Sequence, residues 1–403
     1  MLAKLFKYNI PLHIFLGSTL VTLLILSQCF FGISEMAFGN TWPFKIILLI
    51  GSFVGFFYSE KHFQVKQFVV LFGVSFFFLL TFITENNSFL LDYFIDFLVY
   101  GGSAFLLSFS KINEKIVFWS CVIFGFFWLG LFLITNHFIV EDTFYFGYTI
   151  LPVVVASFLL LTYKDKNIIR FVVKIILFMI AAALLVLKGS RGPVVCFLFF
   201  LFIHFLPCVK KWKGAIVYFS ILATFVVLLI NIEGIVTALH DAMPGKISFI
   251  DKTYDLLTKY GEVSNSRFAI IAEVFNEYGP RDLIFGIGIG NYAATHPQYE
   301  YTHNVFISIM LDCGIIGVLF SFFIVILFFY FIFKQSDERR YPELLFTVSF
   351  ITLLFSGNYW KFFTFWLIIF YMLNITNMFF GDIRKIQEKM SFKRKEHHAK
   401  KTC

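Results

Sequence analysis

Long apolar runs, separated only by short polar clusters, fill this sequence from near its start to about residue 380. Of its 403 residues 59% are hydrophobic and 14% are charged, against about 25% charged residues in an ordinary soluble domain. So few charged side chains cannot cover the surface of a soluble fold, and lipid has to replace water around most of it. The composition therefore indicates a membrane protein and excludes soluble, intrinsically disordered and collagen-like structures.

The apolar runs have the length of transmembrane helices, since about 20 helical residues cross a hydrocarbon core about 30 Å thick. The twelve predicted spans are 11–33, 43–58, 64–84, 89–110, 116–135, 144–163, 168–188, 193–209, 214–232, 304–333, 342–357 and 360–380. We therefore expect an all-α polytopic membrane protein with about twelve transmembrane helices and one long, partly helical extracytoplasmic loop. Its parts are transmembrane helices 1–9 within 1–232, the loop over 233–303, transmembrane helices 10–12 within 304–380, and a basic cytoplasmic tail over 381–403.

Lysine and arginine are shared very unequally between alternate connections of these spans. Of the 33 cations, 24 fall on one side, and the nine on the other are Lys45, Lys188, Arg191, Lys246, Lys252, Lys259, Arg267, Arg281 and Lys361. Because cytoplasmic loops are enriched in Lys and Arg, both termini are predicted to be cytoplasmic. The formal net charge of +8 is thus spread over many cytoplasmic segments, so we expect no nucleic-acid partner.

The predicted loop contains two candidate helices. Ser248 can cap a stretch that runs to Tyr260, and Ser266 can cap a second helix over 267–278 that stops at Gly279 and Pro280. In the second helix one apolar face is predicted to lie on the membrane surface or on the bundle, while Glu273 and Glu277 point elsewhere. That face consists of Phe268, Ile271, Val274, Phe275 and Tyr278.

Several other chemistries are disfavoured by residue spacing. The six cysteines share no metal-ligand spacing, which argues against a disulfide framework or a zinc knuckle. His296, Glu300 and His303 resemble a metal cluster weakly, but Pro297 interrupts any helical register between them, so no metal is expected. The glycines at 286, 288 and 290 lack the strand of a dinucleotide site and predict a close backbone turn. Ser190 does not stand in a Gly-x-Ser-x-Gly elbow, which argues against a serine hydrolase.

Three outward cationic or imidazole groups require a partner, because they break the positive-inside rule or lie where the loop re-enters the membrane. Arg191 lies in a glycine-containing turn after Lys188, Arg267 opens the second loop helix, and His303 precedes Asn304 at the start of the tenth span. Arginine binds phosphate oxygens in a bidentate manner and can stabilise a diphosphate leaving group. Imidazole titrates near neutral pH, so His303 is a candidate base for a sugar hydroxyl. This pattern predicts metal-independent glycosyl transfer from a lipid-linked diphosphate.

Four ordered motifs resemble the bacterial O-antigen polymerase and O-antigen ligase superfamily. They are Gly189-Ser190-Arg191-Gly192, Ser266-Arg267-Phe268, the run from Phe285 to Tyr292 with its three alternating glycines, and His303-Asn304-Val305-Phe306 followed by Cys313-Gly314-Ile315-Ile316-Gly317. The resemblance implies an inner-membrane enzyme that transfers glycan from an undecaprenyl-diphosphate carrier with inversion and without a metal or other cofactor. It also implies Arg191, Arg267 and His303 as catalytic residues. The family often has an acidic residue just before the Gly-Ile-Ile-Gly run, and here Asp312 stands there, followed by Cys313.

Further polar residues are candidate contacts for the diphosphate or the glycan. They are Lys188, Asn304, Tyr301, Asp92, Asp96 and Arg281. Lys188 has an alternative role as a snorkelling membrane anchor. Asp92 and Asp96 are spaced i, i+4 and are predicted to face one side of the fourth span, where they either pair with an arginine or act on a proton or a sugar hydroxyl.

These features favour a polymerase that joins undecaprenyl-diphosphate-linked repeat units at the periplasmic face of the bacterial inner membrane. A ligase that transfers the glycan to lipid A core is the alternative within the family, and a lipid-linked sugar flippase or secondary transporter is the alternative outside it. The transporter is disfavoured because the two halves of the chain show no internal repeat. The expected partners are the lipid-linked oligosaccharide, an acceptor glycan, the lipid bilayer, and a chain-length regulator and flippase of the same pathway.

Overall fold

The computed structural model describes residues 11–27, 41–57, 65–84, 87–134, 143–188, 191–242, 250–251, 254–255, 266–296, 301–334 and 338–374. All regular secondary structure in these ranges is helical. The first group of helices is α2 (Leu12–Ile25), α4 (Trp42–Phe57), α5 (Val65–Thr84), α6 (Phe89–Asp96), η1 (Phe97–Gly101), α7 (Gly102–Leu107), α8 (Glu114–Ile134), α9 (Thr143–Leu161) and α10 (Ile168–Lys188). The second is α11 (Arg191–Phe205), η2 (Leu206–Lys210), α12 (Trp212–Ile230), α13 (Ile232–Ala242), α15 (Ser266–Glu277), α16 (Pro280–Phe285) and α17 (Asn291–Thr295). The last is α18 (Val305–Lys334), α19 (Arg340–Phe346), η3 (Thr347–Ile351), α20 (Thr352–Phe355), η4 (Tyr359–Lys361) and a final helix over Phe363–Asn374.

Each of the twelve predicted spans coincides with helical structure. Within the described residues five helical segments are long and apolar enough to cross a membrane, namely Val65–Thr84, Phe89–Leu107, Ile168–Leu187, Arg191–Lys210 and Val305–Lys334. Four shorter apolar helices are Leu12–Ile25, Trp42–Phe57, Phe146–Leu161 and Phe363–Asn374. The helices agree with a polytopic membrane protein, while the number of crossings and the division into parts remain predictions.

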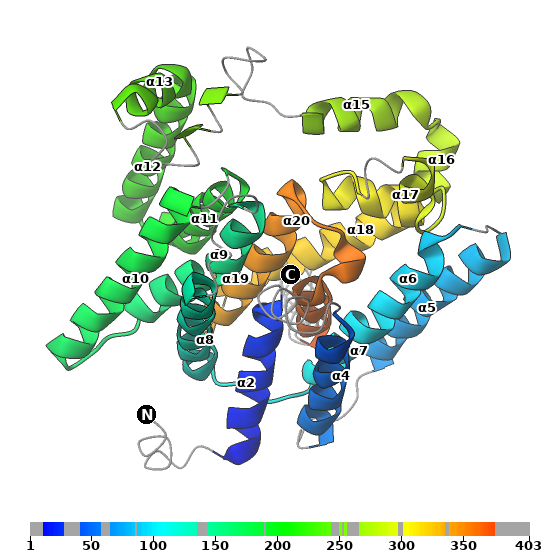
Figure 1. The fold of residues 1–403 in the computed structure, drawn as a ribbon, viewed down its shortest axis with the longest axis horizontal. Helices are drawn as coiled ribbons and strands as arrows, with labels where there is room; N and C mark the ends of the chain where they lie inside the picture. Colours follow the sequence, from blue (N-terminus) through cyan, green and yellow to red (C-terminus); the bar gives the residue numbers. More distant parts are fainter. Residues whose placement is uncertain are drawn as a thin grey trace, which may run out of the picture.

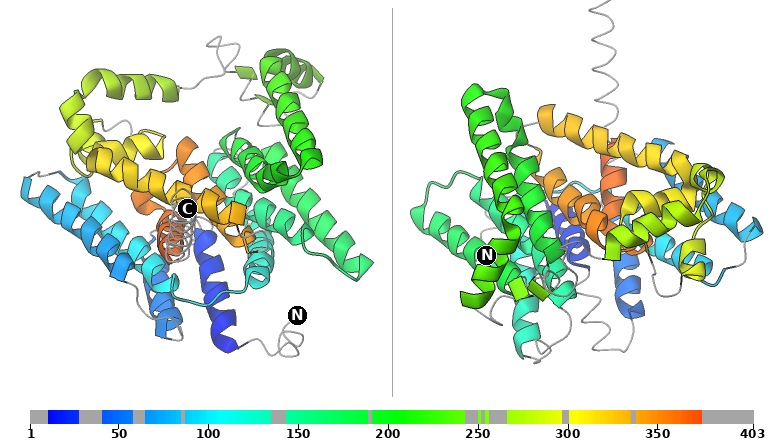
Figure 2. Two further views of the ribbon diagram at one scale, coloured as in Figure 1. Left: turned by 180° about the vertical axis from the view of Figure 1, so that it is seen from behind. Right: turned by 90° about the horizontal axis from the view of Figure 1, so that it is seen from above.

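The long helices form a bundle, and the helices of the predicted loop gather at one end of it (Figure 1). In the bundle α9 packs between α8 and α10 and also contacts α11, while α2 packs on α8 and α4 on α7. At the upper end in Figure 1, α15 runs above α16 and α17, and α13 continues from α12 on the other side. Figure 2 shows the same bundle from behind and from above, with α18 crossing it as one of its longest elements.

The second loop helix is confirmed, and its packed face agrees with the predicted one in part, since Val274 is buried and Ile271 and Tyr278 are partly buried there, whereas Phe275 is not. α15 starts at Ser266 and ends at Glu277, before Gly279. Ile270 and Val274 are buried in a small cluster with Tyr292, Ile307 and Leu311. Phe275, which was predicted on the packed face, is 53% exposed, because helix rotation is set by this cluster and not by the apolar count alone. The side chain of Phe268 and most of the predicted 248–260 helix lie outside the described residues.

Aromatic packing fixes η4, a short turn between α20 and the final helix. Trp360 is 2% exposed, and its ring centroid lies 4.7 Å from that of Phe78 and 5.6 Å from that of Trp366. Trp366 in turn packs edge-to-face on Phe97 at 4.9 Å. Such edge-to-face and tilted pairs stabilise the core beyond simple burial of apolar area. The phenylalanine-rich composition therefore serves to hold polar turns in place as well as to face lipid.

The Gly-Ile-Ile-Gly motif forms a kink that receives the alternating-glycine run. Gly314 has φ 66° and ψ −164°, and this divides α18 into segments 305–313 and 315–334. A Cβ on Gly314 would lie 2.3 Å from the carbonyl oxygen of Ile284, so only glycine allows this approach. The amide of Ile287 donates to the carbonyl of Leu311 at 2.7 Å. The third and fourth motifs of the sequence therefore contact each other through their backbones.

Candidate functional site

A pocket lies where α6, α17, the 301–302 segment, the start of α18 and η4 meet. Its walls carry aromatic rings, hydroxyl groups, an amide and a carboxylate, which are the side chains suited to binding a sugar. They include Tyr93, Tyr301, Thr302, Asp312, Asn358 and Tyr359. These residues come from five separate parts of the chain, so the cavity depends on the whole fold.

Asp312 is the organising side chain of this cavity. Its Oδ2 accepts hydrogen bonds from the Tyr359 hydroxyl at 2.7 Å and from the Trp360 indole N–H at 2.9 Å. Its Oδ1 accepts one from the backbone amide of Gly290 at 3.3 Å. Burial, with the Asp312 carboxylate as a further cause, raises the pKa of the Tyr359 hydroxyl well above its usual value, so this group stays protonated and donates. Asp312 thereby joins the glycine run to η4, and we call these four residues the Asp312 network.

The glycine run forms the close backbone turn that its spacing predicted. Gly286, Gly288 and Gly290 all have positive φ, at 82°, 95° and 78°. Asn87 holds this turn from the side, because its Nδ2 donates to the carbonyl of Ile289 at 2.9 Å. A Cβ on Gly290 would lie 3.0 Å from the Asn87 side chain, so glycine serves both the conformation and the close approach.

His303 is placed beside the cavity in an unusual backbone conformation. Its φ is 56°, the one positive φ among the described non-glycine residues, and such conformations cluster at functional sites. The ring centroids of His303 and Tyr301 are 4.5 Å apart. The Tyr301 hydroxyl lies 3.2 Å from Ser356 Oγ, which ties this segment to the end of α20. The predicted residues Tyr301 and His303 are therefore brought together at the cavity edge.

Asn304, a predicted substrate contact, has a structural role in this structure. Its Oδ1 accepts from the amides of Phe306 at 3.0 Å and Ile307 at 3.3 Å, which caps the N-terminus of α18. Thr302 supports the same turn by donating to the carbonyl of Asn304 at 3.1 Å. The capping fixes where α18 begins and thus where Asp312 lies along it.

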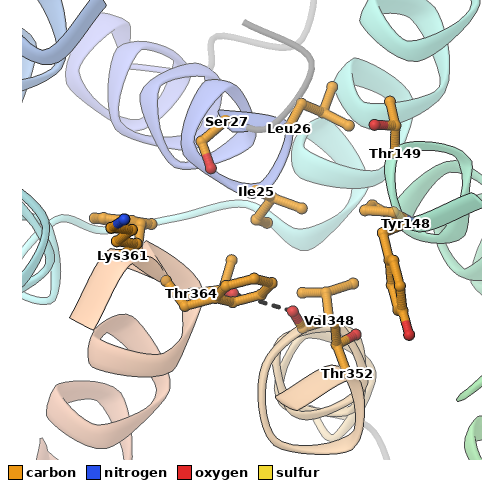
Figure 3. A pocket seen from close by; sticks show the side chains of 12 residues that line it. Ile25, Leu26, Ser27, Tyr148, Thr149, Val348, Thr352, Lys361 and Thr364 are labelled. Carbon is orange, nitrogen blue, oxygen red and sulfur yellow. Dashed lines mark hydrogen bonds between the residues drawn. The ribbon is translucent and has the colours of Figure 1, made fainter. Parts of the chain in front are cut away.

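Arg191 is the first residue of α11, and the next residue, Gly192, packs on Tyr148, which lines a second, larger cavity. This cavity is also lined by Thr149, Thr352, Lys361 and Thr364 among others (Figure 3). Gly192 packs so closely on Tyr148 that a Cβ there would lie 2.2 Å from the hydroxyl. Because Lys361 lines the larger cavity and Tyr359 and Trp360 line the smaller one, η4 borders both.

The remaining predicted cations are placed by their helices. Arg267 is the second residue of α15 and Lys188 the last residue of α10, but their side chains lie outside the described part of the structure. Arg281 is exposed near the start of α16, which follows α15 at the same end of the bundle (Figure 1). Thus the residue after Arg191 packs on a cavity-lining tyrosine, whereas the approach of either arginine to a cavity stays a prediction.

The two carboxylates of the fourth span do not share one environment. Asp96 is buried and pairs with Lys45, whose Nζ lies 2.7 Å from its Oδ1, while Asp92 is exposed. Asp92 and Asp96 stand one turn apart on α6, as their i, i+4 spacing predicts, but the partner of Asp96 is a lysine and not an arginine. This pair also explains one of the nine outward cations, since Lys45 is held by Asp96 and lies 5.3 Å from the Trp42 ring. Tyr359 and Trp360, the two residues of η4 in the Asp312 network, were not among the predicted site residues.

A signal for Asp312 was present in the sequence, because a carboxylate inside a 30-residue apolar helix needs partners. No sequence signal pointed to Tyr359 or Trp360, which lie 47 and 48 residues further along the chain. The partners of a buried carboxylate follow from tertiary packing and not from local spacing.

Residues 176–322 match the family model described as O-antigen ligase. The matched segment begins within α10 and ends within α18, and it contains Arg191, Arg267, His303 and Asp312. The match supports the O-antigen ligase and polymerase superfamily to which the four motifs pointed. No curated protein matches the chain at a significant level.

Proposed function

Starting from this superfamily match, we propose that the protein polymerises surface polysaccharide from undecaprenyl-diphosphate-linked repeat units at the outer face of the bacterial inner membrane. The observation that carries the proposal is the convergence of Tyr301, the glycine turn and Asp312 on one cavity with sugar-binding character, with the His303 ring packed on Tyr301 beside it. Two of the four sequence motifs, the glycine run and the run that starts at His303, contribute to this cavity or border it. Aromatic faces and hydroxyl and amide groups at one cavity suit a glycan better than a lipid tail or a metal ion.

The proposed reaction is a single inverting displacement. The acceptor sugar oxygen forms a bond to the anomeric carbon of the donor, and the bond from that carbon to the diphosphate oxygen breaks. His303 takes the proton of the acceptor hydroxyl. Arg191 and Arg267 stabilise the negative charge that develops on the departing undecaprenyl diphosphate, with Lys188 and Arg281 as further cationic contacts. Guanidinium groups thus take the part that a divalent metal plays in many other glycosyl transfers, and the reaction is proposed to need no cofactor.

The other predicted contacts are assigned by their surroundings. Tyr301 offers a ring and a hydroxyl to the glycan at the cavity wall. Asn304 acts through the helix cap that places His303 and Asp312, and Asp96 acts through Lys45. Asp92, exposed near the start of α6, is a candidate for contact with the glycan outside the cavity.

The proposal is tested with purified protein in detergent, synthetic undecaprenyl-diphosphate repeat units and EDTA, and with products resolved by size. A ladder of longer glycans is expected for the wild type. Arg191→Ala, Arg267→Ala and His303→Ala are each expected to abolish the ladder while the protein still inserts and purifies normally. Lys115→Ala, which removes an exposed cation at the start of α8 that lines neither cavity, serves as the control and is expected to retain the ladder. Wild-type product from all three triad variants would overturn the mechanism.

A ligase is the second candidate, and the description of the matched family model favours it. In the same assay a ligase gives no product until lipid A core is added, and then gives a single transfer of the preformed glycan. A flippase would move the lipid-linked unit across vesicles without forming a new bond. The three activities therefore differ in product, not only in rate.

A further inference from the structure

Two glutamates of α15 and a histidine from the end of α17 form a group of potential metal ligands away from the cavities. Glu273 and Glu277 are spaced i, i+4 on one face of α15, and His296 directly follows α17 (Figure 1). One ligand atom from each of the three residues lies within 4.8 Å of the others, and His296 Nε2 is 2.9 Å from Glu277 Oε2. Both glutamates are exposed, whereas His296 is 7% exposed and stacks on Tyr292 with ring centroids 4.6 Å apart.

The hydrogen bonds of His296 determine which ring nitrogen faces the glutamates without a proton. Thr295 Oγ1 donates toward the backbone carbonyls of Asn291 at 3.0 Å and Tyr292 at 3.2 Å, which can only accept. The contact of 2.9 Å between Thr295 Oγ1 and His296 Nδ1 therefore favours the proton on Nδ1. In neutral histidine this leaves the Nε2 lone pair directed at a carboxylate oxygen. A hydrogen bond from Nδ1 to a fixed acceptor is the usual arrangement that orients a metal-binding histidine.

Two lone pairs at 2.9 Å need a cation between them, either a proton on Nε2 or a metal ion. A proton on His296 Nε2 is shared with Glu277 only, so it does not involve Glu273. A divalent ion uses all three ligands and balances both carboxylates. Ligand atoms around such an ion, at metal–ligand distances of about 2.1 Å, lie about 3.0–3.4 Å apart, a spacing that the exposed glutamate side chains can reach by small rotations.

We propose that Glu273, Glu277 and His296 bind one divalent transition-metal ion such as Zn²⁺, which clamps α15 to α17. One imidazole and two carboxylates suit zinc and manganese better than magnesium or calcium, which prefer all-oxygen sites. The clamp adds to the small apolar cluster through which Ile270 and Val274 already dock α15. The ion is structural: the apolar cluster keeps α15 docked without it, so glycosyl transfer is expected to proceed in EDTA as well.

The clamp matters because α15 carries Arg267 at its second position, and this consequence rests on the proposed function. Glu273 and Glu277 lie two and three turns along α15 from Arg267, so fixing them limits the tilt of the helix. On the other side, α17 follows Gly290, whose amide donates to Asp312. The metal therefore connects the helix of a predicted catalytic arginine to the backbone of the cavity.

The test measures metal binding directly on the full-length protein in detergent, with the affinity tag removed and the metal stripped by EDTA and desalting. Titration with ZnCl₂ by calorimetry, together with elemental analysis, is expected to show one bound ion per chain. Glu273→Gln/Glu277→Gln and His296→Gln are each expected to weaken that site at least about 10-fold, because every removed ligand costs at least as much as a lost supporting contact. The glutamate substitutions lie on the surface, so size-exclusion profiles are expected to match the wild type.

His240→Gln is the matched control. His240 also contacts a carboxylate, since its Nδ1 lies 3.0 Å from Asp251 Oδ1, but that pair belongs to no three-ligand group among the described residues. This variant is expected to bind Zn²⁺ like the wild type. Wild-type binding no tighter than that of Glu273→Gln/Glu277→Gln would overturn the proposal and leave a protonated His296–Glu277 pair. Since the readout is binding, its failure leaves the glycosyl-transfer proposal intact. Retained transfer in Arg191→Ala with normal Zn²⁺ binding would contradict only the glycosyl-transfer mechanism.

Discussion

Asp312 and Glu343 are two of the carboxylates within apolar helices of this protein, and their partners differ in kind. Asp312 is partly buried beside a cavity and accepts hydrogen bonds from a tyrosine, a tryptophan and a backbone amide, all of them neutral donors. Glu343 is 0% exposed, and its oxygens lie 2.7 Å from His204 Nδ1 and 3.3 Å from Arg339 Nε. We call this second group the Glu343 network.

The two sets of partners distinguish a carboxylate with a structural role from a carboxylate that faces a candidate site. A fully buried carboxylate next to cationic groups is matched inside the protein and adds little at any surface. A carboxylate whose partners are neutral dipoles keeps its negative charge uncompensated. Beside a cavity, that charge and its fixed position act on whatever occupies the cavity. His204 and Arg191 stand at the two ends of α11, about 20 Å apart along the helix axis, so one helix serves both regions.

The largest expected effect concerns the stability of the Glu343 network. Glu343→Ala leaves His204 and Arg339 without their buried partner, which costs about 3–5 kcal/mol of folding stability. Unfolding in detergent, followed by tryptophan fluorescence, measures the loss. The fraction that remains folded is expected to transfer glycan at the normal rate per molecule. A stable Glu343→Ala protein without activity would remove the distinction between the two carboxylates.

Asp312→Asn is expected to show the opposite pattern. The amide keeps an oxygen for one donor but presents N–H groups to the others, so η4 and the glycine turn are no longer held together. We expect transfer to fall about 100-fold, which corresponds to about 2.7 kcal/mol in the activation free energy. The unfolding midpoint in detergent is expected to move much less than in Glu343→Ala. Kinetics with purified repeat units measure the first effect, and unchanged activity would show that Asp312 only supports the fold.

The sequence predicted the helices well and their side-chain partners poorly. Helix positions follow from hydrophobic length and from caps and breakers near each end, as with Ser266 at the start of α15 and Gly279 after its end. The alternating glycines also predicted their turn, since positive φ favours glycine. Such features are local, so a single stretch of sequence carries the information.

Partners distant in sequence depend on the rotation of each helix about its axis, and no local pattern encodes that angle. Lys45 and Asp96 are 51 residues apart, and the expected partner of Asp96 was an arginine. Glu277 and His296 meet because Ile270 and Val274, not Phe275, turn toward the cluster. The candidate site was therefore predicted in its motif residues, Tyr301 and His303, and missed in the supporting residues that hold them.

Tyr359→Phe is expected to have a smaller effect than Asp312→Asn, because it removes one of three donors to the carboxylate. One hydrogen bond to a charged group is worth about 1.5–3 kcal/mol, so we expect activity to fall about 10-fold or somewhat more. Tyr371→Phe is the matched control, since this ring packs on Tyr341 at 5.3 Å and touches neither cavity. Equal losses in the two variants would show that tyrosine hydroxyls in this bundle matter for packing and not for the Asp312 network.

The smallest expected effect separates capping from substrate contact at Asn304. Asn304→Ala loses the oxygen that accepts from Phe306 and Ile307, which costs about 1 kcal/mol of stability and loosens the first turn of α18. Asn304→Asp keeps that oxygen, and a negative charge at a helix N-terminus is favourable, so it is expected to restore both stability and transfer. A direct contact from the amide N–H₂ group to the glycan would instead be lost in both variants. Melting curves and transfer rates for the two proteins decide between a residue that positions Asp312 through its helix and one that binds the sugar itself.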